Sequence, residues 1–145
     1  VPVKPQESAK PSKPSKLVSN KLKVDGSWGC DTTTASQKVY HTPVDGIVSR
    51  QPKCNKKYLP KAYTGSWMFY VKAANYRQGS ALIKAIQKDL KAKKFYDGEI
   101  DGLCGKKTVI AIQKFLNSMG YNLVVDGYMG KKTVMAWQQY INSRL

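Results

Sequence analysis

Apolar residues recur every three or four positions in three segments of the C-terminal half of the chain. In order, the segments carry Leu82 or Ile83 with Ile86 and Leu90, then Val109, Ile112, Leu116 and Met119, then Val134, Trp137, Ile141 and Leu145. This spacing places the apolar side chains on one face of a helix. It predicts three helices of about three turns each that pack into one small core between residues 79 and 145.

The N-terminal half follows the pattern less regularly. A helix is expected over residues 31–40. After Asp45, Ser49 replaces a repeated glycine and Pro52 disfavours a helix, so a short or distorted helix is expected there.

The connector from residue 62 to residue 78 has a different periodicity. Within it Trp67, Phe69 and Val71 alternate with the two residues between them. Alternation of this kind predicts a short strand or hairpin.

One block of sequence recurs without gaps at three places. The copies read VDGSWGCDTTTASQKVY from Val24, IDGLCGKKTVIAIQKFL from Ile100 and VDGYMGKKTVMAWQQYI from Val125. Partial copies begin at Gly79 and Val44. The frame predicts an Asp-Gly turn, a second glycine that caps the next helix at its N-terminus, and then the helix itself.

Two polar positions of the frame have both a structural and a ligand-binding interpretation. For Gln37, Gln87, Gln113 and Gln138, hydrogen bonds to the backbone of a neighbouring Asp-Gly turn are favoured over contacts to a ligand. For Thr32, Thr108 and Thr133, hydrogen bonding at the start of a helix is favoured.

The first sixteen residues, VPVKPQESAKPSKPSK, hold four prolines, four lysines and three serines. Such a segment buries too little apolar surface to offset the entropy of ordering it. It is interpreted as a linker from a preceding domain, and it lacks the apolar run of a signal peptide. No later apolar run is long enough to cross a bilayer.

The charge of the chain favours a polyanionic partner. Twenty-five lysines and arginines stand against nine acidic residues, which gives a net charge of +16. Nucleic acid, anionic lipid and a bacterial wall that carries teichoic acid all fit this charge.

The residues that could support catalysis or bind a metal are few. His41 is the single histidine, and the three cysteines form no C-x-x-C pair, so neither a metal site nor a cofactor is expected. Reduced and mostly buried thiols are favoured, with a bridge from Cys30 to Cys54 left open. Either of these two cysteines beside His41 is a formal catalytic alternative.

Carboxylates give no convincing acid and nucleophile pair either. Five aspartates precede a glycine and are assigned to turns: Asp25, Asp45, Asp97, Asp101 and Asp126. Outside the linker this leaves Asp31, Asp89 and Glu99 for glycosidase chemistry, which needs two carboxylates that flank the sugar. The chain is therefore predicted not to be an enzyme.

The repeated frame resembles the peptidoglycan-binding-domain repeat of bacterial and phage wall hydrolases. Residues 79–145 are similar to one complete three-helix unit, and residues 17–61 to a degenerate one. The resemblance implies a mainly α fold: a linker over 1–16, a first unit over 17–61, an irregular connector over 62–78 with short β structure, and a second unit over 79–145.

The wider arrangement, with its Asp-Gly-Ser-Trp-Gly and Thr-Pro-Val-Asp-Gly-Ile-Val-Ser segments, resembles the C-terminal wall-binding region of endolysins from phages of lactobacilli and related Gram-positive hosts. It implies a non-catalytic module that targets an attached peptidoglycan hydrolase to the wall after release from the host cytoplasm. The expected ligand is peptidoglycan, through its glycan strand, stem peptide or cross-bridge, and teichoic acid is a second candidate.

Lysines at helix starts and aromatic side chains are the candidate binding groups. A lysine in the first turn opposes the helix dipole, and a bound phosphate or carboxylate would offset that cost, although a solvated lysine remains the alternative. Glycans commonly lie against aromatic faces. The candidate ligand-binding residues are Trp28, Trp67, Tyr70, Tyr128, Lys106, Lys107, Lys131 and Lys132.

Two tryptophans have a competing place in the core. Trp28 shares its repeat position with the apolar Cys104 and Met129, and Trp137 lies on the apolar face of its helix. The second functional hypothesis for the chain is a basic helical domain that binds nucleic acid, which is less favoured because no reading helix or aromatic-basic sheet motif is present.

Overall fold

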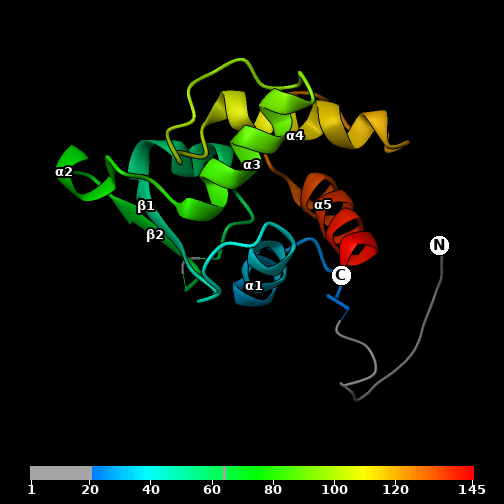
Figure 1. Ribbon diagram of the computed structural model, residues 1–145, viewed down its shortest axis with the longest axis horizontal. Helices are drawn as coiled ribbons and strands as arrows, with labels where there is room; N and C mark the ends of the chain where they lie inside the picture. The colour runs from blue at the N-terminus through cyan, green and yellow to red at the C-terminus, as the bar shows by residue number, and fades with distance from the viewer. Residues whose placement is uncertain (1–20, 64) are drawn as a thin grey trace.

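The structure, a computed structural model, describes residues 21–63 and 65–145, so the predicted linker lies outside the described residues. The elements are α1 (Cys30–Val39), β1 (Val48–Pro52), the 3-10 helix η1 (Lys53–Tyr58), β2 (Trp67–Tyr70), α2 (Ala73–Tyr76), α3 (Ala81–Ala92), α4 (Lys106–Ser118) and α5 (Lys131–Arg144). Figure 1 shows the small two-stranded sheet at one side of the molecule, beside α2, with α1, α3, α4 and α5 grouped next to it. The predicted mainly helical fold with short β structure in the connector is confirmed.

The helices of the repeated blocks begin where the frame predicts. Gly29, Gly105 and Gly130 are the N-caps of α1, α4 and α5. At α3 the frame has Ser80 one residue after its glycine, and the Ser80 hydroxyl accepts a hydrogen bond from the backbone N–H of Ile83. The three helices expected over residues 79–145 are confirmed as α3, α4 and α5.

The distorted helix expected directly after Asp45 is wrong, because that segment forms β1 before the 3-10 helix begins. β1 pairs with β2 in parallel, with Val48 opposite Trp67 and Pro52 opposite Tyr70. Pro52 fixes its own φ and disfavours a helical conformation in the residue before it, which explains the extended backbone.

Each of the four repeated glutamines holds an Asp-Gly turn. The Gln37 side-chain oxygen accepts hydrogen bonds from the backbone N–H groups of Asp45 and Gly46 at 3.0 and 2.9 Å. Its amide nitrogen donates to the Asp45 carboxylate at 2.9 Å. The same arrangement joins Gln113 to Asp126-Gly127 and Gln138 to Asp25-Gly26. Gln87 bonds the Gly102 backbone N–H and the Asp101 carboxylate. The structural interpretation of the glutamines is confirmed.

Threonines extend three of these contacts to the next helix. The amide nitrogens of Gln87 and Gln113 donate to the hydroxyls of Thr108 and Thr133 at 3.1 and 3.2 Å. Gln138 reaches Thr32 at 2.9 Å. Because Gln138 is in the last helix and Thr32 in the first, this third contact joins the two ends of the described chain.

The core therefore extends over both halves of the chain rather than residues 79–145 alone. The Trp28 ring lies 5.7 Å from the ring of Trp137 on α5 and 5.5 Å from that of Trp67 on β2. α5 contacts both α1 and α4 (Figure 1). The expectation of a separate core in the C-terminal half is corrected, because α5 buries Trp137 against the N-terminal half.

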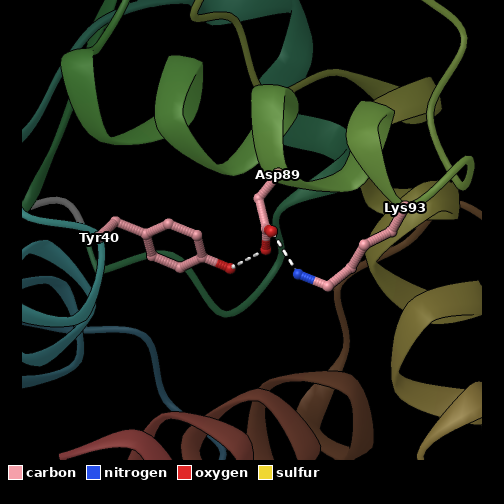
Figure 2. A network of polar contacts seen from close by, with 3 residues as sticks. All are labelled: Tyr40, Asp89 and Lys93. Carbon is pink, nitrogen blue, oxygen red and sulfur yellow. Dashed lines mark hydrogen bonds and ion pairs between the residues drawn. The ribbon is translucent and has the colours of Figure 1, made fainter.

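A polar network also links the two halves (Figure 2). Tyr40, the C-cap of α1, donates a hydrogen bond to the Asp89 carboxylate of α3 at 3.1 Å, and Lys93 pairs with the same carboxylate. Burial, together with contacts to Tyr140 and Asp89, raises the pKa of the Tyr40 hydroxyl. The hydroxyl therefore remains a protonated donor at neutral pH.

Candidate functional site

A groove of about 770 Å³ lies between η1, α2 and the start of α4. One wall comes from the N-terminal half and the connector, and includes Asn55, Tyr58 and Tyr76. The other wall comes from Lys91 and the segment that leads into α4. The groove is therefore assembled from parts of the chain that are distant in sequence.

Three tyrosines line the groove, and two of them are fixed by other contacts. The Tyr96 hydroxyl donates to the Glu99 carbonyl at 2.5 Å and accepts from Gln87 at 3.3 Å, and burial raises its pKa. The Tyr58 ring packs against the Tyr128 ring, with 5.7 Å between the ring centroids, and the Tyr58 backbone carbonyl accepts from the backbone N–H of Met129 at 2.8 Å. Tyr76 is half-buried on α2, which leaves part of its ring open to a ligand.

The groove carries charges of both signs. Lys91, Lys106 and Lys107 supply the cations, and all three are exposed. Asp97 and Glu99 are exposed carboxylates on the loop that precedes α4.

Other polar groups at the groove are occupied by the fold. The Asp101 carboxylate accepts hydrogen bonds from Gln87 and from the backbone N–H of Leu103, at 3.0 and 2.9 Å. Beneath the groove Cys104 is fully buried, which raises the pKa of its thiol to about 12, and its backbone N–H donates to Gln51. These groups shape the site and leave ligand contacts to the exposed lysines, carboxylates and Tyr76.

The first lysine of each pair also supports the fold. The Lys106 stem lies against Gly127, so closely that a Cβ atom at that glycine would collide with it. Lys131 covers Gly26 in the same way. Hydrogen bonds from the Tyr128 backbone and the Gln113 side chain hold the pKa of Asp126 below its ordinary value. The charge of the Lys106 ammonium lowers this pKa further. Lysines at this position therefore pack on the following turn with their methylene groups.

The structure brings only part of the predicted ligand set together. Lys106 and Lys107 line the groove, while Lys131 and Lys132 are exposed at the start of α5 and do not line it. Tyr128 is 46% exposed and Tyr70 is half-buried, and neither lines the groove.

The expectation that Trp28 and Trp67 contact a ligand is corrected. Each is only 1% exposed, because the two rings pack against each other inside the core. For Trp28 the alternative assignment to the core is confirmed, as it is for Trp137.

Sequence reasoning missed the residues of the groove that come from η1, α2 and α3. Tyr58 and Tyr76 are aromatic residues in polar segments that have no apolar stripe. This isolation is the sequence feature that could have marked them as candidate ligand-binding residues. Their approach to Lys91 and Glu99 depends on the packing of distant segments, which no local pattern reveals.

The cysteines differ from the expected mostly buried thiols. Cys30 and Cys54 are exposed and free, and Cys104 is free and buried. Within residues 21–63 and 65–145, no three His, Cys, Asp or Glu side chains are grouped as a metal site would require. The helices described here include none that is long and apolar enough to span a membrane.

Comparison with protein families gives a match in the second half of the chain. Residues 79–136 match the family model described as a putative peptidoglycan binding domain. The matched segment contains α3, α4 and the first part of α5, and with them the wall of the groove from Lys91 to Thr108. No curated protein and no solved structure gave a significant match.

The similarity is to a binding domain, and it lies within the C-terminal half of the chain. It supports peptidoglycan as the partner and the cell wall as the place of action.

Proposed function

We propose that the chain binds peptidoglycan in the groove at the start of α4 and carries an attached peptidoglycan hydrolase to its substrate. The main observation is that one wall of the groove lies within residues 79–136, the segment similar to a peptidoglycan binding domain. A half-buried tyrosine beside charged side chains suits a polymer of sugars and short peptides, because a rigid ring contributes contact area at little entropic cost.

The path of the chain supports attachment at a distance from the groove. The Asn142 side chain of α5 bonds both the backbone N–H and the carbonyl of Leu22, at 2.6 and 2.8 Å. This contact fixes the start of the described chain beside the C-terminus, which lies far from α2 in Figure 1. A catalytic domain joined ahead of residue 21 would leave the groove open to the wall.

The proposed parent protein is a phage endolysin that acts on a Gram-positive host. The basis is the resemblance of residues 24–87 to the wall-binding region of such enzymes, together with the proline-rich segment at positions 1–16. Attachment to the wall raises the local concentration of the hydrolase at its substrate. Teichoic acid is a secondary partner in this proposal, since the net charge of +16 attracts any polyanion.

The test is retention of the purified chain on Gram-positive sacculi, with and without chemical removal of teichoic acid, at low and at about 0.3 M salt. We expect retention on the stripped wall at the higher salt. Binding lost with teichoic acid would assign the interaction to charge alone. Failure on every wall preparation, with retention on duplex DNA, would replace the proposal by nucleic-acid binding.

A further inference from the structure

We infer that the groove recognises the peptide part of peptidoglycan, through a free carboxylate and a free amine of that peptide, rather than the glycan strand. The inference rests on the proposed function and specifies its ligand. Its basis is that exposed lysines and exposed carboxylates line the same wall of the groove, from residue 91 to residue 108.

The cations of the groove come from α3 and α4. Lys91 is in the last turn of α3, and its ammonium donates to the Gly98 carbonyl at 3.1 Å. Lys106 packs its stem on the turn at Gly127. Lys107 is exposed, lines the groove and is the cation best placed to receive a ligand carboxylate.

The carboxylates of the groove come from the loop between α3 and α4. The Tyr96 hydroxyl holds this loop through the Glu99 carbonyl, so the Glu99 side chain is exposed on a fixed backbone. Asp97 is exposed two residues earlier. Neither carboxylate belongs to an ion pair of the described residues, in contrast to Asp89, which pairs with Lys93.

The charges of peptidoglycan match this arrangement only in its peptides. The sugars of the glycan carry N-acetyl amides, which are neutral, whereas the peptides carry carboxylates and amines that are ionised at neutral pH. Charged groups placed opposite their counterions confer specificity, and a wrongly charged ligand is disfavoured. Tyr76 then supplies an apolar contact surface on the other wall of the groove.

The probe is the tetrapeptide L-alanyl-γ-D-glutamyl-L-lysyl-D-alanine, titrated into the 145-residue chain by calorimetry. The comparison ligands are the same peptide with its lysine side chain acetylated, the same peptide with an amidated C-terminus, and glycan fragments freed of peptide. We expect each capped peptide to bind roughly fivefold more weakly, and the glycan fragments more weakly still.

Variants assign the two charges of the ligand to Lys107 and Glu99. Lys107→Gln should weaken the unmodified peptide roughly fivefold and remove the effect of amidation, and Glu99→Gln should do the same for acetylation. Lys132→Gln is the matched control, because Lys132 occupies the same repeat position at the start of α5 outside the groove. Asp31→Asn, an exposed carboxylate of α1, is the control for Glu99.

Two results separate this inference from the proposed function. If peptide-free glycan binds as tightly as whole peptidoglycan and the tetrapeptide does not bind, the peptide assignment is overturned while peptidoglycan binding stands. If the chain binds neither these fragments nor stripped sacculi, both proposals fail. Equal losses for Lys107→Gln and Lys132→Gln would also overturn the assignment of the carboxylate to the groove.

Discussion

At the scale of single residues, the glutamines show how one side chain can define a turn. Gln138 satisfies the backbone N–H groups of Asp25 and Gly26 and also bonds the Asp25 carboxylate. It is fully buried, so its removal would leave buried donors without a partner. An unsatisfied buried donor destabilises the fold by more free energy than an average hydrogen bond contributes to its stability.

We therefore expect Gln138→Ala to lower the free energy of unfolding by about 1 to 3 kcal/mol. Urea denaturation followed by tryptophan fluorescence measures this change. Gln139→Ala is the matched control, because Gln139 is the exposed neighbour on the same helix and should change stability little. Equal effects of the two substitutions would contradict the role assigned to Gln138.

The hydrogen bonds of the polar repeat residues could be predicted from local chemistry, whereas the burial of Trp67 could not. The bonds of Gln37 and Thr108 to a nearby turn follow from residue type and spacing alone. Trp67 is in the irregular connector, and it packs against Trp28, about forty residues away in sequence, so its place in the core could not be predicted from its neighbours.

At the scale of elements, regular helices were predictable and the β segment was not. Residues 79–145 combine strong periodicity with glycine caps, so the positions of α3, α4 and α5 follow from the sequence. After Asp45 the frame lacks both the second glycine and the threonine, whose position is taken by Pro52. Parallel pairing with β2 then decides the conformation, and such pairing is nonlocal.

The contact between α1 and α3 gives a prediction at this scale. Tyr40→Phe keeps the ring beside Trp137 but removes the hydrogen bond to Asp89. We expect a loss of roughly 0.5 to 1.5 kcal/mol in the free energy of unfolding. Thermal denaturation measures it, with Tyr63→Phe as the control on a 57% exposed tyrosine. An unchanged midpoint for Tyr40→Phe would show that the network in Figure 2 contributes no net stability.

At the scale of the whole molecule, the contacts between the repeated glutamines and the Asp-Gly turns form a closed series. Each glutamine holds the turn that follows its helix, and the last glutamine holds the first turn of the described chain. The groove depends on the same closure, because one of its walls comes from residues 52–76 and the other from residues 91–108. Fold and site therefore share the contacts that join the two halves.

A fragment of residues 79–145 should consequently fold poorly by itself. It would lose the rings of Trp28 and Tyr40 from the face of Trp137, and it would lose the turn that Gln138 holds. We expect this fragment to show reduced helicity and no cooperative thermal transition by circular dichroism, in contrast to the 145-residue chain. A sharp transition near that of the whole chain would instead support two independent units divided near residue 61.

The central claim is that the groove, and not the exposed surface in general, binds the wall. The most direct measurement compares the affinities of Tyr76→Ala and Tyr63→Ala for Gram-positive sacculi stripped of teichoic acid, at about 0.3 M salt. Tyr76 lines the groove, while Tyr63 is an exposed tyrosine that does not. We expect the first substitution to weaken binding about tenfold, in the range of a lost aromatic contact, and the second to leave it unchanged. Unchanged binding by folded Tyr76→Ala would contradict the account.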